Sequence, residues 1–168
     1  MYSQNNEEEI ILQFFKGSAT GTFLDIGAYN PFKFSNTRAL YEKGFKGVFV
    51  EPSPTLKPAF DQAYGRDEGI QLLPLCIGAR NGVVDFYNAC GDAVSTTIKE
   101  ETVRWEKGLG VKFELLQIEM VDVPTLLSRC LYRTFDFINI DTEGNVFEIL
   151  EQINPVALDC QLMCVEWN

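Results

Sequence analysis

The sequence contains no histidine, and this absence limits the chemistry open to the chain. Ser-His-Asp and Cys-His nucleophilic machinery are excluded, together with every zinc site that relies on imidazole. Any general base must therefore be a carboxylate, a lysine, a tyrosine or a cysteine. Basic residues are also scarce, because 14 Lys and Arg stand against 24 Asp and Glu, a formal net charge of −10. Since this charge repels phosphate backbones, we expect no nucleic-acid partner.

Long apolar runs and paired cysteines are missing as well. No run approaches the roughly 18 residues of a membrane-spanning helix, and the opening residues MYSQNNEEEI lack the basic and apolar regions of a signal peptide. The five cysteines include no CxxC pair, so we interpret most of them as reduced core residues. These features predict a soluble, cytoplasmic protein with no membrane partner, and we assign no metal site.

The composition is that of an ordinary globular protein. Of the 168 residues, 46% are hydrophobic and 23% are charged, which excludes a disordered or fibrous chain. No internal repeat, low-complexity tract or Pro/Ser/Gly-rich linker divides the sequence. We therefore predict one domain over residues 1–168, with an N-terminal helical segment (1–20) and a core (21–168).

Short apolar runs alternate with helical patterns along the chain. Nearly continuous apolar character is typical of strands that helices cover on both faces. We expect such strands at residues 22–26, 47–51, 71–76, 135–140 and 162–166. Pro74 lies within the third run and lacks a backbone donor, which predicts a bulged or edge strand there.

Helical spacing of apolar residues fills the intervals between these runs. The expected helices span residues 7–16, 36–43, 54–64, 124–131 and 145–152. This alternation predicts an α/β fold with a doubly wound, mostly parallel sheet. Two more strands are expected at 83–87 and 116–121, and the polar segment 95–108 is interpreted as a mobile cover over a site.

Two residues at expected strand ends indicate a nucleotide site. In a doubly wound sheet, ligands bind beyond the carboxyl ends of the strands. Gly27 follows the first strand and lets the backbone approach a ligand, whereas Glu51 ends the second and can accept hydrogen bonds from both hydroxyls of a ribose. Glu51 lies 24 positions beyond Gly27, close to the roughly 20-residue separation of nucleotide-binding α/β units. Taken alone, Gly27 is better interpreted as a plain loop glycine, but its pairing with Glu51 favours a ligand.

The loop after the first strand distinguishes between nucleotide cofactors. The NAD fingerprint requires GxGxxG, where the later glycines admit a pyrophosphate. Residues 27–32 read GAYNPF, a single glycine followed by bulky residues that would crowd a pyrophosphate. A nucleoside with a small zwitterionic tail fits better, which points to S-adenosylmethionine rather than NAD.

Two carboxylates follow the fourth expected strand. Asp141 and Glu143 lie two residues apart in IDTEG, and positions i and i+2 of an extended chain face the same side. We predict Asp141 as the base or the group that orients the acceptor, with Glu143 as the second choice. For Glu143, capping of the following helix is an equally good interpretation.

Several sequence blocks resemble the FkbM-type methyltransferases, which are S-adenosylmethionine-dependent enzymes of the Rossmann-like class. The blocks occur in the family's order and are FLDIGA (23–28), SNT (35–37), GVFVEP (47–52), INIDTEGN (138–145) and CVE (164–166). Each block is weak alone, but their combination is specific, and the resemblance runs from about Ser3 to Asn168.

The resemblance implies roles for residues of the cofactor pocket. It implies that the methionine moiety is lined by Asp25, Gly27 and Ala28, and that Glu51 holds the ribose. It further implies that Cys76 and Ile77 flank the adenine and that Asp141 stands nearest the transferred methyl. The remaining residues that it assigns to the pocket are Tyr29, Asn36 and Pro52.

The same resemblance implies a function and raises one question. Many family members methylate hydroxyl oxygens on sugars or natural products, so a small-molecule or glycan acceptor is expected. The family's sheet usually adds two strands beyond the position of Asn168, so the expected sheet lacks its last two strands. Three explanations for the missing strands stay open: a short natural form, a truncated chain, or a chain that a partner completes, including a second copy in a homo-oligomer. The alternative function is a non-catalytic methyltransferase-fold binding or assembly module, and an NAD-dependent oxidoreductase is disfavoured by the single-glycine loop.

Overall fold

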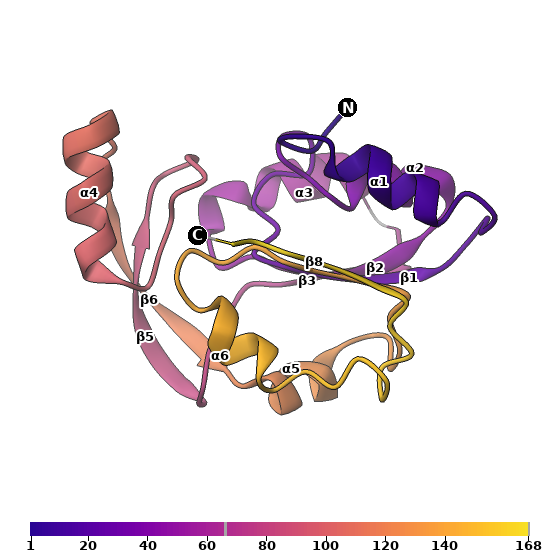
Figure 1. Cartoon of the computed structure of the whole chain (residues 1–168). Helices are drawn as coiled ribbons and strands as arrows, with labels where there is room; N and C mark the ends of the chain where they lie inside the picture. Colours follow the sequence, from indigo (N-terminus) through magenta and orange to yellow (C-terminus); the bar gives the residue numbers. More distant parts are fainter. Residues whose placement is uncertain (66, 168) are drawn as a thin grey trace.

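A central parallel sheet organises the chain, as a computed structural model of residues 1–65 and 67–167 shows (Figure 1). The strands lie in the order β3 (Ile70–Leu73), β2 (Lys46–Val50), β1 (Thr22–Ile26), β7 (Phe137–Ile140) and β8 (Leu162–Val165). All four neighbouring pairs are parallel. The doubly wound sheet predicted from the alternation of runs is therefore confirmed.

Helices cover both faces of this sheet. One face carries α1 (Glu7–Phe14), α2 (Arg38–Lys43), the short 3-10 helix η1 (Pro54–Leu56) and α3 (Lys57–Tyr64), whereas α5 (Val123–Arg129) and α6 (Val146–Leu150) lie on the other (Figure 1). None of the helices within residues 1–65 and 67–167 is long and apolar enough to cross a membrane.

The two faces of the sheet have different cores. Successive strand residues point to opposite faces, so each strand contributes to both layers. Phe23, Phe49 and Phe137 point toward α1–α3, where edge-on ring contacts such as Phe23–Phe49, with centroids 5.1 Å apart, build an aromatic core. Their neighbours Leu24 and Ile138 point toward α5 and α6 and belong to an aliphatic core. Both layers exclude water from the central strands, which explains the unbroken apolar runs.

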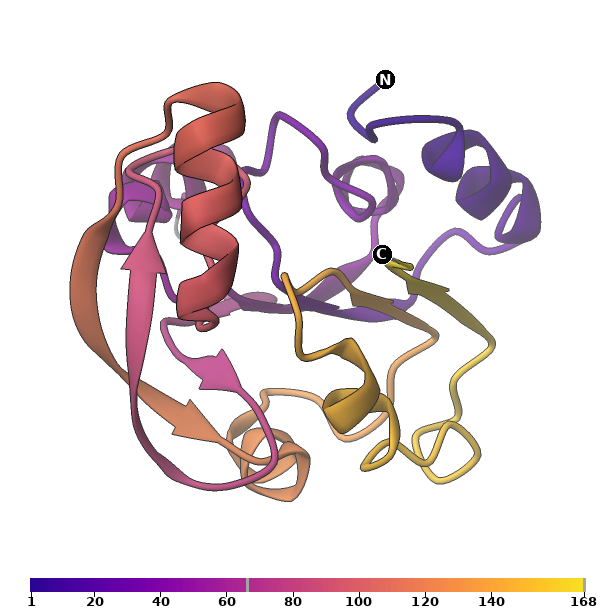
Figure 2. The ribbon, with the colours of Figure 1, turned by 60° about the vertical axis from the view of Figure 1, so that its left-hand side comes forward.

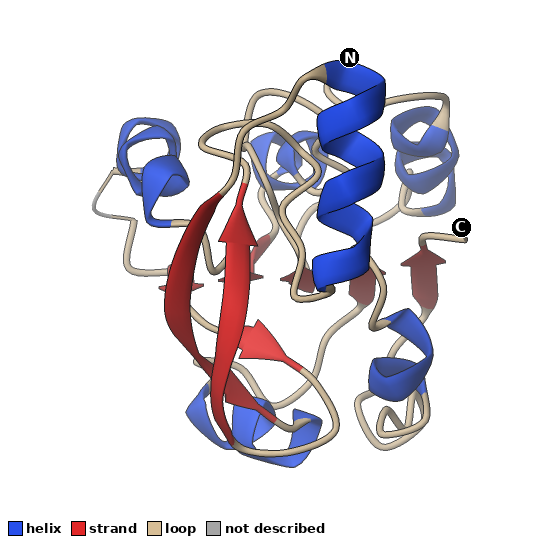
Figure 3. Ribbon diagram, turned by 90° about the vertical axis from the view of Figure 1, so that its left-hand side faces the viewer, coloured by secondary structure: helices blue, strands red, loops and turns tan. Residues whose placement is uncertain are grey.

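A second sheet stands beyond the carboxyl ends of the central strands (Figures 1 and 2). Its order is β4 (Cys76–Ile77), β6 (Glu114–Val121) and β5 (Gly82–Asn88), with β5 and β6 antiparallel. Helix α4 (Lys99–Leu109) lies beside this sheet (Figure 3). The two expected strands at 83–87 and 116–121 thus pair with each other, and the expected cover segment contains a helix of 11 residues.

The expected strand at 71–76 is wrong as one element. Proline has no N–H for a sheet ladder, and the N–H of Leu75 donates instead to the carbonyl of Leu73 at 3.0 Å, which turns the chain at Pro74. The segment before the proline is β3, the edge strand of the central sheet, and the segment after it is β4 of the second sheet. The edge position that Pro74 predicted is confirmed.

The helices begin and end close to the expected positions. The helix expected from residue 36 begins at Arg38, whose N–H donates to Ser35 Oγ at 3.1 Å, and Gly44 ends it in the left-handed region with φ of +113°. Ser35 therefore satisfies a free donor of the first turn, although Thr37 occupies the N-cap position.

Candidate active site

The turn after β1 brings three strand ends together. Gly27 has φ of +79°, and a Cβ at this position would overlap the carbonyl oxygen of Asp141. Both the conformation and the close approach therefore require glycine. The N–H groups of Gly27 and Ala28 donate to the carbonyl of Val50 at 3.0 and 3.1 Å. The ends of β1, β2 and β7 thus meet at this turn.

Glu51 lies at the end of β2 with its carboxylate held from two sides. Its side chain is buried, and its oxygens accept the N–H of Tyr29 at 2.9 Å and the N–H of Ser53 at 2.8 Å. A carboxylate oxygen has two acceptor positions, so each oxygen retains one for a ligand. Burial raises the pKa of Glu51 to about 7, although the two N–H groups lower it and Asp25 raises it further.

A cavity opens beside Glu51. Its walls are largely apolar and include Ile26, Val50, Pro52, Leu56, Leu75, Cys76, Ile77 and Phe86. Burial raises the pKa of the Cys76 thiol to about 12, so the thiol stays protonated and contributes an apolar surface. The cavity therefore combines an apolar slot with the carboxylate of Glu51, and the carboxylates of Asp92, Asp141 and Glu143 also lie on its walls.

A buried hydrogen-bond network fixes Asp25, in the middle of the sheet. Its carboxylate accepts the hydroxyl of Thr37 at 2.5 Å and the side-chain N–H of Asn139 at 2.8 Å. Asn36 donates in turn to the side-chain oxygen of Asn139 at 3.0 Å. Burial raises the pKa of Asp25 to about 6, against the two donors, which lower it. The network ties the segment before α2 to β1 and β7.

A second cavity adjoins the first and shares Gly27, Tyr29 and Asp141 with it. Most charged groups on its walls are acidic: Glu7, Asp25, Asp92, Asp141, Glu143 and Glu166, against the single guanidinium of Arg104. Burial raises the pKa of Asp141, and the nearby carboxyl of Glu166, which hydrogen-bonds to it, raises it further. Burial and Glu166 also raise the pKa of Glu143, to about 7. The cavity therefore favours a ligand that carries positive charge.

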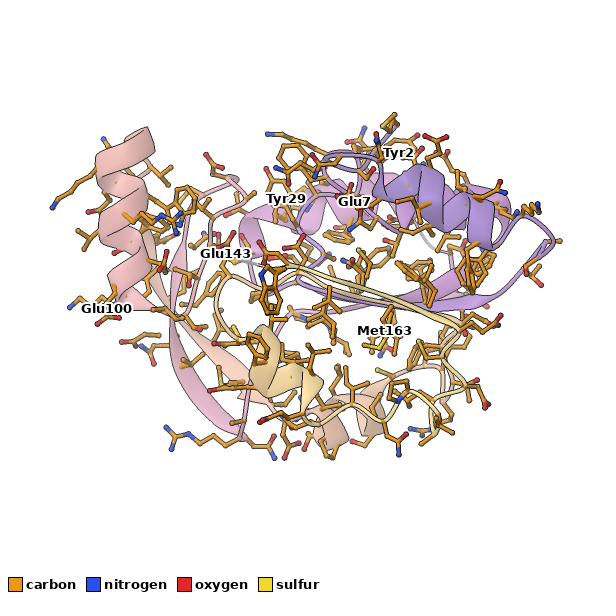
Figure 4. All side chains as sticks on the ribbon, viewed as in Figure 1. Tyr2, Glu7, Tyr29, Glu100, Glu143 and Met163 are labelled. Carbon is orange, nitrogen blue, oxygen red and sulfur yellow. The ribbon has the colours of Figure 1, made fainter. Side chains whose placement is uncertain are left out.

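The segment between β5 and α4 covers the junction of the two cavities. Tyr29 donates its hydroxyl to the carbonyl of Gly91 at 2.9 Å, and Thr96 donates to the carbonyl of Glu143 at 3.0 Å. Figure 4 shows Tyr29 and Glu143 at the end of the central sheet that faces the second sheet. Asn145 adds a hydrogen bond to Thr97 at 3.2 Å. Loops from β1 and β7 thus hold the cover in place.

Two donors near this cover have no partner. The indole N–H of Trp105 on α4, which lines the second cavity, and the hydroxyl of Thr142, which lines the first, are buried without a hydrogen-bond partner among the described residues. Buried polar groups of this kind are rare, and each is available to a ligand. By contrast, no group of three or more carboxylate or thiol side chains within residues 1–65 and 67–167 is arranged to hold a metal ion.

All site residues predicted from the sequence line one or both cavities. The first cavity holds Glu51, Pro52, Cys76 and Ile77, the second holds Asp25, Ala28 and Asn36, and both hold Gly27, Tyr29, Asp141 and Glu143. The capping interpretation of Glu143 is not supported, because the N-cap of α6 is Asn145.

Other residues of the site were not singled out from the sequence. Glu166 follows β8 as Glu51 follows β2, so its position after an apolar run was an available signal. Asn139 and Thr37 act through Asp25; both lie within blocks of the family resemblance, INIDTEGN and SNT, but no pocket role was assigned to them. Trp105 comes from α4, and no pattern in the sequence connects it to the site.

Comparisons with known proteins agree with this arrangement. The methyltransferase FkbM domain family matches residues 25–167. A crystal structure of methyltransferase FkbM from Methylobacillus flagellatus KT is similar in fold, with a TM-score of 0.50 and 11% sequence identity. The similarity covers 80% of this chain but 29% of that chain, so this chain spans less than a third of that protein's length. No curated protein matches the sequence. The match over residues 25–167 shows that the chain belongs to the FkbM methyltransferase domain family.

Proposed function

We propose that the protein is an S-adenosylmethionine-dependent methyltransferase that methylates a hydroxyl group of a sugar or small natural product. S-adenosylmethionine, when bound, supplies a methyl group on a positively charged sulfur. The observation that carries the proposal is the carboxylate of Glu51, which Tyr29 and Ser53 hold at a strand end. It lies in a cavity with largely apolar walls that adjoins a second cavity lined mostly by acids.

The first cavity fits the adenosine part of this cofactor. Glu51 retains one acceptor position on each oxygen, which suits the two hydroxyls of a ribose. The apolar walls at Pro52, Cys76 and Ile77 suit an adenine ring. These residues would bind and orient the nucleoside.

The second cavity fits the charged part of the cofactor. Asp25, Gly27, Ala28 and Asn36 lie on the side of this cavity next to the β1 turn and would hold the amino-acid tail. The surrounding carboxylates favour a ligand with net positive charge, which a sulfonium nucleoside has and NAD lacks. The residues that line the two cavities therefore fit S-adenosylmethionine.

The chemical role of the protein is mainly alignment. Holding an acceptor oxygen in near-attack geometry is worth roughly 7–11 kcal/mol of barrier, and a positioned base adds about 10²–10⁴-fold. We propose that Asp141 takes or orients the proton of the acceptor hydroxyl, with Glu143 as the second candidate. Both carboxyl groups have a pKa raised mainly by burial, which makes them stronger bases than ordinary carboxylates.

The walls of the second cavity also support the class of acceptor. Tyr29, Phe34, Trp105 and Trp167 provide aromatic surfaces, and the carboxylates provide hydrogen-bond acceptors for hydroxyl groups. A polyhydroxylated small molecule or glycan matches this combination. An acceptor with a carboxylate or phosphate group would be repelled by the same acids.

Calorimetric titration with S-adenosylmethionine and S-adenosylhomocysteine tests the proposal. We expect both to bind, and we expect Glu51→Gln to weaken both by about 10–100-fold, because hydrogen bonds to a charged group contribute about 1.5–3 kcal/mol. Glu114→Gln, on an exposed part of β6, is the matched control and should leave both affinities unchanged. Absence of binding to either compound would contradict the proposal and favour a non-catalytic binding or assembly module.

A second measurement addresses the base. Asp141→Asn preserves the shape of the side chain and removes its charge. Once an acceptor is identified, turnover should fall by about 10²–10⁴-fold in this variant. Turnover equal to that of the unmodified protein would rule out Asp141 as the base.

A further inference from the structure

The sheet places Asp141 and Glu166 side by side. Strands β7 and β8 are parallel, with Ile140 opposite Val165, so the next residues of the two strands leave the sheet as neighbours. The N–H of Glu166 donates to the carbonyl of Ile140 at 2.9 Å, which continues the ladder to this point. Both side chains line the second cavity, and a hydrogen bond joins their carboxyl groups.

The environment of this pair disfavours two negative charges. Further acids surround it. Asp25 on β1 and Glu143 after β7 raise the pKa of Asp141, Glu101 on α4 acts on Glu143, and Glu7 on α1 and Asp92 after β5 line the same cavity, where Arg104 on α4 is the one cation on the described wall. The thiol of Cys164 on β8 lies on the same wall, and burial raises its pKa to about 11, so it remains neutral. Repulsion between two neighbouring carboxylates in such a place disfavours the state in which both are ionised.

We propose that Asp141 and Glu166 act as one proton-holding pair, which releases its proton when a cationic sulfonium nucleoside binds and takes up the proton of the acceptor hydroxyl during methyl transfer. Glu166 is then the positioning and proton-sharing partner of Asp141. This inference rests on the proposed function and assigns it a further residue.

The charges balance through the reaction. The new bond joins the acceptor oxygen to the methyl carbon, the bond between that carbon and sulfur breaks, and its electron pair stays on sulfur. The sulfur thus loses its positive charge while the pair gains the hydroxyl proton, so the total charge of the site is unchanged. A unit charge about 5 Å from a carboxylate at an effective dielectric of about 20 changes its proton affinity by about a hundredfold. The pair is therefore a weak base before transfer and a stronger one as the sulfur charge disappears.

Proton counting during binding tests the pair without an acceptor. Calorimetric titration in phosphate and in Tris at pH 7 gives the number of protons released, because the two buffers have different ionisation enthalpies. We expect S-adenosylmethionine to release up to about one proton more than S-adenosylhomocysteine, whose sulfur is neutral. In Glu166→Gln both compounds should still bind, and the difference in proton release should fall to the share that Glu143, with a pKa of about 7, contributes by itself.

Glu114→Gln is the matched control. Glu114 lies on an exposed part of β6 and is not among the residues that line the two cavities. The substitution therefore removes one carboxylate without changing the surroundings of the pair. We expect the proton counts of Glu114→Gln to equal those of the unmodified protein.

The outcomes separate the pair from the proposed function. If neither compound binds the unmodified protein, the proposed function and the pair fail together. If both bind with equal proton release, or if Glu166→Gln retains the full difference, the pair is overturned while the proposed function stands. Asp141→Asn provides a second variant should Glu166→Gln not fold, and the same fall of the difference is expected.

Discussion

The buried acids of the site predict that the protein becomes less stable as the pH rises from about 4.5 to 7. Burial raises the pKa of Asp25 from 3.8 to about 6 and that of Glu51 from 4.5 to about 7. In this window the folded protein holds protons that the unfolded chain has released. These protons stabilise the folded state. Their contribution to the free energy of unfolding is complete below the pKa values of the unfolded chain, and it is lost as the pH rises through the pKa values of the folded protein.

The size of the effect follows from these values. One pKa unit corresponds to 1.36 kcal/mol, so Asp25 and Glu51 each account for roughly 3 kcal/mol. The two carboxylates influence each other, so their effects do not simply add, and we expect a total of about 3–6 kcal/mol. For a chain of this length, about 2–4 °C of melting temperature corresponds to 1 kcal/mol, which predicts a fall of about 10 °C.

Thermal unfolding at constant ionic strength between pH 5 and pH 8 measures this slope. Acids that are paired on the surface do not contribute to the change of melting temperature in this pH range. For example, a hydrogen bond from Lys46 lowers the pKa of Asp67, so the stability that Asp67 contributes is lost only as the pH falls below about 4. Asp25→Asn keeps partners for Thr37 and Asn139 and should remove the part of the slope that lies below about pH 6, while Glu51, Asp141 and Glu143 retain the rest. A melting temperature that is constant or rises between pH 5 and pH 7.5 would refute the reasoning.

Two further predictions concern the turn after β1 and the cover. Gly27→Ala should lower the melting temperature by 10 °C or more, or prevent folding, because the new Cβ would overlap the Asp141 carbonyl and φ is positive at this position. Gly82→Ala is the control and should change the melting temperature little, because no atom lies within 4 Å of a Cβ at that position. Tyr29→Phe removes the hydrogen bond to Gly91, worth about 1 kcal/mol, and should speed release of S-adenosylhomocysteine about fivefold. Stopped-flow tryptophan fluorescence measures that rate, and a rate equal to that of the unmodified protein would contradict a holding role for the hydroxyl.

Much of this arrangement was predictable from local sequence. Continuous apolar runs predicted the central strands, because a strand covered on both faces has no polar side. Gly27, Glu51 and Asp141 were found because each directly follows such a run, and parallel strands end at the same edge of a sheet. Pro74 likewise predicted an edge strand from its missing donor alone.

Only the tertiary structure decided which of these residues meet. The sequence does not state that β7 lies between β1 and β8, yet this order brings Asn139 to Asp25 and Glu166 to Asp141. Trp105 reaches the second cavity because β5 and β6 carry α4 across the strand ends. Side-chain periodicity is a property of neighbours along the chain, whereas strand order and register depend on packing between distant segments. The strand ends, and so the place of the site, were therefore encoded locally, and the grouping of its acids was set by the fold.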